Sequence, residues 1–145
     1  MVKISTKTRY GTRAMLDLAL HYGEGPVPLK DIATRQGISE RYLENIMTAL
    51  VSAGLLQSRR GQQGGFKLSR LPCEIKLSQI IQVLEGSLAM VKCADDYKTC
   101  DRAIGCTSHE IWKILKNGMI KILDSITLED MVNMEKKKCL QGDER

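Results

Sequence analysis

The sequence predicts a mainly α-helical fold: a winged helix-turn-helix with a small two-stranded wing, followed by a long C-terminal dimerisation helix. Three observations predict it: a helix–glycine–helix pattern, a glycine-rich hairpin directly behind it, and a long apolar helix that follows a cysteine-rich loop. We expect a winged helix-turn-helix domain over residues 1–90, the loop over residues 91–106, and the dimerisation helix with its tail over residues 107–145.

The helix-turn-helix is predicted from residues 29–50. Gly37 ends the first helix, because glycine adopts the left-handed conformation of a sharp turn at no steric cost. Ser39 then offers its hydroxyl as the N-cap of a second helix. Two packed helices that touch no nucleic acid show the same spacing, so this stretch alone leaves both interpretations open. The apolar positions at helical spacing are Leu29, Ile32 and Ala33 before the turn, and Leu43, Ile46, Met47 and Leu50 after it.

The hairpin is predicted from a short strand over residues 55–60, a turn at Gly61-Gln62-Gln63-Gly64-Gly65 and a returning strand over residues 66–69. Arg59 and Arg60 stand at its tip beside glycines that let the backbone approach a surface closely. A wing on a phosphate backbone or in a minor groove needs this combination. Two arginines on a solvated turn are the ordinary alternative, and the helix-turn-helix directly upstream favours contact with DNA.

The charge distribution supports this interpretation. The formal net charge is +5. Residues 1–70 hold 11 Lys and Arg against 5 Asp and Glu, whereas residues 71–145 hold 11 against 12. The positive field therefore lies on the half with the helix-turn-helix, as in a polyanion-binding domain.

The composition also predicts the compartment and the state of the thiols. No run of 18 apolar residues exists, and the first ten residues lack the apolar core of a signal peptide. We expect a cytoplasmic protein without a membrane partner, in which thiols stay reduced. The odd number of cysteines, five, argues against a disulfide framework and favours metal or redox chemistry.

Further helices are predicted on both sides of the wing. A first helix, capped by Ser5 or Thr6, runs to about Tyr22, and its basic outer positions either touch DNA backbone or form a solvated face. A core helix covers residues 76–85. A helix over residues 107–126 has a wider apolar face than the winged helix can cover, which predicts a partner helix from a second copy. Thr127–Asp130 reads as a capping box for a short last helix, and we expect a frayed tail from Lys136 onward.

Three cysteines, Cys93, Cys100 and Cys106, fall within one loop, and His109 follows in the first turn of the long helix. Thiolates on a loop can converge on one point, and with an imidazole they fit either Zn²⁺ or an iron–sulfur cluster. The tight C-x-x-C pair of a zinc knuckle is absent, and the longer spacings suit the larger group better. The alternatives are three loose surface cysteines and an ordinary helix-start histidine. Cys73 and Cys139 receive no role.

Taken together, these segments resemble a known family. TRYGTRAMLDLAL, GPVPLKDIATRQGIS, YLE, the RRGQQGGF wing, the cysteine loop and ITLEDMVN are similar to IscR-type iron–sulfur cluster regulators, which are dimeric bacterial winged-helix transcription factors. The resemblance covers nearly the whole chain. It implies a cluster, in the first place [2Fe–2S], that controls DNA binding and thereby the genes of iron–sulfur biogenesis.

The resemblance also implies roles for individual residues. Cys93, Cys100, Cys106 and His109 are the implied ligands, Arg60 is the wing arginine, and residues 39–48 lie in the recognition helix. Two departures are visible: the first cysteine interval is one residue longer than the commonest pattern, and the wing has Gln-Gln where that pattern has Pro-Gly. Relatives in the wider family bind [4Fe–4S] and sense nitric oxide, some through an acidic N-terminal ligand, and residues 7–9 here offer no carboxylate.

We therefore hypothesise a homodimer that places two recognition helices in successive major grooves of a pseudo-palindromic operator. Glu44 would accept from a cytosine amine and repel phosphate elsewhere, which gives it a role in choosing between sites. The predicted DNA-contacting residues are Ser39, Arg41, Tyr42, Glu44, Asn45, Thr48, Arg59, Arg60 and Gly61.

Two rival functions remain open. One is a nitric-oxide or redox-sensing repressor with a [4Fe–4S] cluster, and the other is a structural-zinc protein whose winged helix binds another protein. An enzyme is not predicted, because the chain has no glycine-rich phosphate loop after a strand, no nucleophile–base constellation and only two histidines, His21 and His109.

Overall fold

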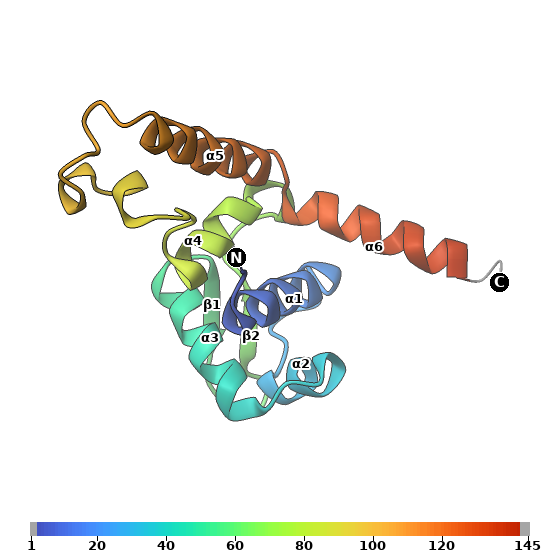
Figure 1. Cartoon of the computed structure of the whole chain (residues 1–145). Coiled ribbons are helices and arrows are strands. Elements are labelled where there is room, and N and C mark those ends of the chain that lie inside the picture. Colours follow the sequence, from blue (N-terminus) through green and yellow to red (C-terminus); the bar gives the residue numbers. More distant parts are fainter. Residues whose placement is uncertain (1–2, 143–145) are drawn as a thin grey trace.

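The computed structural model describes residues 3–142 and is mainly helical (Figure 1). Two turns of 3-10 helix, Lys92–Ala94 and Tyr97–Thr99, interrupt the cysteine loop, and a third, Pro72–Glu74, follows the wing. The principal elements are α1 (Thr6–Leu20), α2 (Leu29–Gln36), α3 (Glu40–Ser52), β1 (Leu56–Arg59), β2 (Gly65–Leu68), α4 (Leu77–Glu85), α5 (Thr107–Asp124) and α6 (Leu128–Gly142). This order confirms the predicted winged helix-turn-helix with a two-stranded wing.

One hydrophobic core holds α1, α2, α3, α4, the wing and the first turns of α6 together. Gly11 lies where α1 crosses α3 and α4, and a Cβ built there would overlap Leu84 Cδ1 and stand 3.1 Å from Ile46 Cγ2. A side chain at this position would force the buried Leu84 side chain to move. The largest fully buried side chains are Met15, Ile32, Leu43, Ile46, Met47, Leu50, Ile75, Ile80, Leu128 and Thr8.

The turn of the helix-turn-helix has the predicted chemistry. Gly37 adopts φ 64° and ψ 39° at the end of α2. The Ser39 hydroxyl accepts a hydrogen bond from the Tyr42 amide at 3.3 Å and caps α3. These two residues set the angle at which α3 leaves α2, so that one face of α3 is buried and the other is exposed.

The wing is fastened to the loop before α2. Leu56 to Arg59 pair antiparallel with Leu68 to Gly65. Beyond this ladder, the amide and the carbonyl of Val27 exchange hydrogen bonds of 2.8 and 2.9 Å with Phe66. Gly65, at φ 151°, passes so close to the Val27 carbonyl that any side chain there would overlap it. The hairpin thus gains a third backbone partner, which fixes β2 relative to the start of α2.

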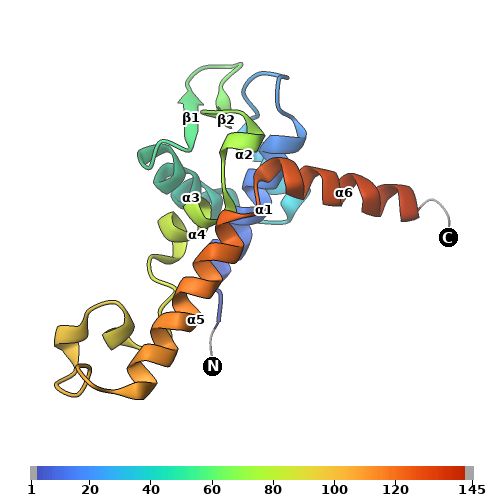
Figure 2. The same ribbon diagram turned by 90° about the horizontal axis from the view of Figure 1, so that it is seen from above.

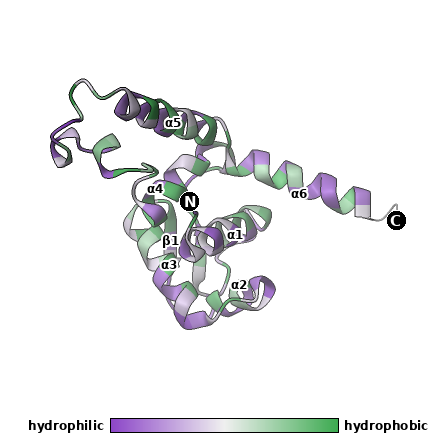
Figure 3. Ribbon diagram, viewed as in Figure 1, coloured by the Kyte–Doolittle hydropathy of each residue, from purple (hydrophilic) through white to green (hydrophobic). Residues whose placement is uncertain are grey.

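The long helix α5 extends away from this body, and the cysteine loop lies at its far end (Figure 2). No residue of α5 is buried in the described part of the chain. Green, apolar segments alternate with purple ones along its length (Figure 3). The large side chains Ile111, Ile114, Leu115 and Ile122 are all exposed. An apolar face of this extent on one helix is characteristic of an interaction surface.

Several predicted boundaries differ from the structure; the long helix α5, for example, ends at Asp124 rather than at residue 126. The first helix ends at Leu20 rather than Tyr22, because the chain turns at His21 toward Gly23 with φ 91°, and Tyr22 is exposed. The last helix is not short, and the chain does not lose its regular structure at Lys136, because α6 continues to Gly142. The last part of the predicted tail, residues 143–145, lies outside the described residues.

Within residues 3–142, no helix is both long enough and apolar enough to cross a membrane.

Candidate nucleic-acid interface and metal centre

The exposed face of α3 carries most of the predicted DNA-contacting residues. Leu43, Ile46 and Met47 point into the core. Because α3 is amphipathic, the remaining positions face outward together. They present hydroxyl, guanidinium, amide and carboxylate groups without burying any of them. The exposed members are Ser39, Arg41, Tyr42, Glu44, Asn45 and Thr48.

A groove joins this face to the wing. Its volume is about 570 Å³, and its lining includes Glu44 and Thr48 from α3 and Arg59, Arg60 and Gly61 from the wing. The structure therefore brings together five of the predicted contact residues, two from α3 and three from the wing. Arg41, Asn45, Tyr42 and Ser39 lie on the same helix outside the groove. A groove with two arginines on one wall and a carboxylate on the other can attract a polyanion while excluding it from one position.

The recognition helix is tied to α1 by aromatic packing. The rings of Tyr10 and Tyr42 meet edge to face with centroids 5.9 Å apart. The Arg13 guanidinium lies 5.6 Å from the centroid of the Tyr10 ring. Tyr42 is therefore a positioning residue for α3 as well as a candidate contact, a role the sequence did not reveal.

A buried carboxylate fixes α2 against α1. Asp17 is 2% exposed and accepts hydrogen bonds from Arg35 at 2.7 and 2.9 Å and from Gln36 at 3.0 Å. Burial by itself raises the pKa of Asp17, but the hydrogen bonds from Arg35 and Gln36, with the charges of Arg35 and His21, outweigh it and hold that pKa below its usual range. Sequence reasoning missed this network, although an acid inside an apolar stripe was a signal.

The cysteine loop is partly exposed. Cys93 and Cys106 are half-buried and Cys100 is exposed. Among the described residues, no three His, Cys, Asp or Glu side chains lie close enough together to hold one metal ion. Cys106 stands at the N-cap of α5 without capping it through its side chain. Its thiol is therefore free to act as a ligand, and a thiolate there would face the positive end of the α5 dipole.

His109 is the unusual member of the set. Its Nδ1 is buried and has no hydrogen-bond partner. Buried ring nitrogens are normally satisfied, so an orphaned one needs an explanation, and a metal ligand is one of the standard explanations. The donor set of three thiols and one imidazole, with His109 three residues after Cys106 at the start of α5, fits an iron–sulfur cluster.

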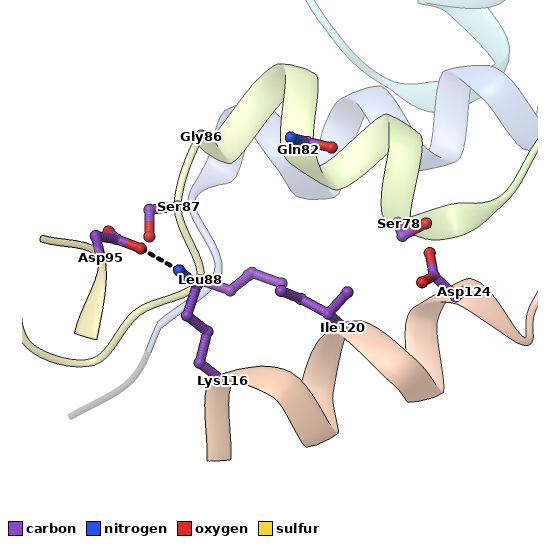
Figure 4. A pocket seen from close by; sticks show the side chains of 9 residues that line it. All are labelled: Ser78, Gln82, Gly86, Ser87, Leu88, Asp95, Lys116, Ile120 and Asp124. Carbon is purple, nitrogen blue, oxygen red and sulfur yellow. Dashed lines mark hydrogen bonds and ion pairs between the residues drawn. The ribbon is translucent and has the colours of Figure 1, made fainter. Parts of the chain in front are cut away.

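An ion pair joins the loop to α5. Lys116 Nζ lies 2.5 Å from Asp95 Oδ1 and 3.4 Å from the Ala94 carbonyl oxygen (Figure 4). Hydrogen bonds from Lys116 and then Ser87 hold the pKa of Asp95 below its usual range. A cavity of about 490 Å³ lies beside the pair, between α4 and α5. No pattern in the sequence predicted this contact.

An exposed recognition helix beside a basic wing defines the class of winged-helix DNA-binding transcription regulators. Residues 4–134 match Rrf2, described as an iron-dependent transcriptional regulator family. The chain therefore belongs to the Rrf2 family, and its relatives are regulators rather than enzymes.

Curated relatives and solved structures agree with this assignment. CymR, an HTH-type transcriptional regulator of Bacillus subtilis, is 41% identical over 91% of both chains. IscR of Aliivibrio salmonicida, also an HTH-type transcriptional regulator, is 40% identical over 90% of this chain and 77% of the relative. The structure of T. potens IscR superposes with a TM-score of 0.77 at 46% identity, over 94% of this chain and 90% of the other. The structure of B. subtilis CymR, described as the global cysteine regulator, superposes with a TM-score of 0.77 at 40% identity, over 92% of this chain and 98% of the other.

Proposed function

We propose that this regulator senses iron–sulfur cluster status: Cys93, Cys100, Cys106 and His109 hold a cluster, in the first place [2Fe–2S], that sets its affinity for DNA. The observation that carries the proposal is the buried, partnerless Nδ1 of His109 next to a loop with three free thiols. The similarity to IscR proteins supports it. Iron–sulfur biogenesis genes are the proposed targets.

The cluster would supply a charged, redox-active centre whose presence depends on the supply of iron and sulfide. The protein's own residues provide the rest. Three thiols must be ionised and the imidazole must be neutral to act as ligands, so assembly releases protons. An imidazole in place of a fourth thiolate leaves the site less negative, which raises the reduction potential and makes retention sensitive to acid.

On the DNA side, we propose that α3 enters the major groove and that the wing contacts the backbone. The arginines Arg59 and Arg60 bind phosphate, which gives affinity without sequence preference. Glu44, facing them across the groove, accepts from a cytosine amine at permitted sites and repels the backbone at others. Arg41 and Asn45 are the proposed base-reading side chains, because a guanidinium pairs with guanine and an amide with adenine.

We propose that the active form is a homodimer on a pseudo-palindromic double-stranded operator. The support is α5, whose apolar side chains are exposed in the single chain. A second copy of α5 would cover them, and two-fold symmetry would present two recognition helices to two half-sites. The division into a DNA-binding part over residues 1–90, a cluster loop over residues 91–106 and a dimerisation part from residue 107 belongs to this proposal.

A second candidate function is cysteine regulation without a cluster. It is favoured by the match to B. subtilis CymR, which covers 91% of both chains. The two candidates differ in one observable property. Cluster sensing requires DNA affinity to change when iron is removed, whereas cluster-free regulation leaves it unchanged.

The experiment compares DNA affinity with and without the cluster in single cysteine variants. The probe is a duplex recovered from a random library by selection on the wild-type protein purified without oxygen. Cys93→Ala, Cys100→Ala and Cys106→Ala should each abolish the difference between the loaded and the chelated protein. Cys139→Ala is the matched control, because that exposed thiol on α6 lies outside the loop. If every loop variant keeps the wild-type difference, the sensing proposal is wrong.

A further inference from the structure

The first turn of the cysteine loop packs against α5, and an ion pair joins the two. Asp95 lies two residues after Cys93, and its carboxylate meets Lys116 of α5 at 2.5 Å. Figure 4 shows Lys116 reaching from α5 past Leu88 toward Asp95, with Ser87 beside the same carboxylate. A cavity of about 490 Å³, lined by residues of α4 and α5, lies beside the ion pair.

The last residue of α4 is attached to the beginning of α1. Glu85, two residues before Ser87, accepts hydrogen bonds from the Ser5 amide at 3.1 Å, the Ser5 hydroxyl at 2.8 Å and the Thr8 hydroxyl at 2.5 Å. A carboxylate at a helix N-terminus is favoured by the helix dipole as well as by these donors. Thr8 is 1% exposed, so its hydroxyl depends on partners within the protein.

From α1 the contacts continue into the recognition helix without a gap. Gly11, one turn after Thr8, lies against Leu84 of α4 and Ile46 of α3 so closely that no Cβ fits. Two residues after Thr8, Tyr10 packs edge to face on Tyr42 of α3. Packed helices transmit small displacements because their contacts have little room to yield.

From this chain of contacts we infer that Lys116–Asp95 and the Glu85 cap are the two joints that couple the cysteine loop to the recognition helix. The inference rests on the proposed function, since the signal it transmits is the state of the cluster. When the ligand residues change position, Asp95 moves with Cys93, and the displacement passes through Ser87 and Glu85 to the N-terminus of α1. Lys116 holds Asp95 against α5, so that the loop cannot rearrange without moving this segment.

The first test needs no cluster. Hydrogen–deuterium exchange is measured on the full-length chelated protein, wild type against Lys116→Gln and Asp95→Asn. The coupling predicts faster exchange, by about tenfold or more, in residues 93–100 and also in residues 5–8, which are far away in the sequence. Lys113→Gln on the exposed face of α5 and Asp101→Asn in the same loop are the charge-matched controls. Faster exchange confined to the loop would overturn the inference.

The second test measures coupling in the loaded protein. Allosteric couplings are typically worth roughly a five- to 150-fold change in affinity. Lys116→Gln, Asp95→Asn and Glu85→Ala should each reduce the ratio of loaded to chelated DNA affinity by about threefold or more, with iron and sulfide contents near wild type. The double variant with Asp95→Lys and Lys116→Asp, which exchanges the two charges, should restore part of the lost affinity ratio. Ratios within twofold of wild type in all three variants would overturn the inference.

The two tests separate this inference from the proposed function. If the wild type itself shows no difference between loaded and chelated protein, the sensing function fails, and with it the coupling. If the wild type responds to the cluster and the three variants respond equally, only the coupling route is wrong. Loss of the cluster in Lys116→Gln together with exchange unchanged at residues 5–8 would also count against the route.

Discussion

Replacing Arg35 with glutamine should destabilise the fold at neutral pH by about 2 kcal/mol. The reason is Asp17, which is 2% exposed and holds α2 against α1 through two hydrogen bonds from Arg35. Removing one partner of a fully buried ion pair costs about 3–5 kcal/mol, because the remaining charge loses its compensation. Here the Arg35 side chain is 39% exposed and Gln36 keeps its bond, so solvent and the amide recover part of that cost.

The loss of unfolding free energy in Arg35→Gln should also depend on pH. In the wild type the pKa of Asp17 lies below its usual range, so its stabilisation is complete above that range and is lost as the pH falls through the lowered pKa. Without Arg35, burial dominates and the pKa rises. The difference between wild type and Arg35→Gln should therefore be largest at about pH 7 and should be smaller at about pH 3, because protonation of Asp17 removes the charge that Arg35 compensates.

The assay is urea unfolding followed by far-ultraviolet circular dichroism, with the free energy of unfolding extrapolated to water at each pH. Lys30→Gln is the control, because it removes the same charge from an exposed position of the same helix. The reasoning is refuted if the two variants lose equal stability, or if the Arg35→Gln difference is the same at both pH values.

Three further predictions concern packing, capping and DNA binding. Gly11→Ala should lower the free energy of unfolding by about 1–3 kcal/mol, because the added methyl group overlaps Leu84. Gly118→Ala, at an exposed position of α5, is the control and should not destabilise the protein. The melting temperatures of the two variants test this difference. Thr127→Ala should cost about 1 kcal/mol, since Thr127 and Asp130 cap α6 reciprocally, and an unchanged melting temperature would contradict this. Arg60→Ala should weaken binding to all duplexes alike and should reduce the slope of log K against log salt concentration by about 1. Fluorescence anisotropy measures both effects. A loss of affinity limited to one DNA sequence would show that Arg60 reads a base instead.

Local features of the fold could be read from the sequence because they depend on neighbouring residues. Gly37 and Ser39 determine the turn between α2 and α3 through backbone conformation and a cap, whatever the rest of the chain does. The capping box at Thr127 is local in the same sense. The continuation of α6 through Lys136 was missed because that stretch has no apolar period, although Lys, Glu and Met are good helix formers.

The contacts that organise the site could not be read in this way. Asp17 with Arg35, Glu85 with Ser5, and Lys116 with Asp95 join residues separated by 18, 80 and 21 positions. Such pairs follow from how whole helices pack, which no local spacing encodes. The sequence supplied the candidate ligands and DNA contacts, and the structure supplied the orphaned His109 Nδ1 and the groove that unites α3 with the wing.

The most direct test of the account is the visible absorption spectrum of the protein purified without oxygen, with iron, acid-labile sulfide and zinc counted per chain. We expect a coloured protein with two irons and two sulfides, and His109→Ala should lose its colour at a higher pH or more rapidly in air than the wild type. Four irons and four sulfides would move the function to a redox or nitric-oxide sensor. A colourless protein with one zinc, unchanged after reconstitution with iron and sulfide, would contradict cluster sensing.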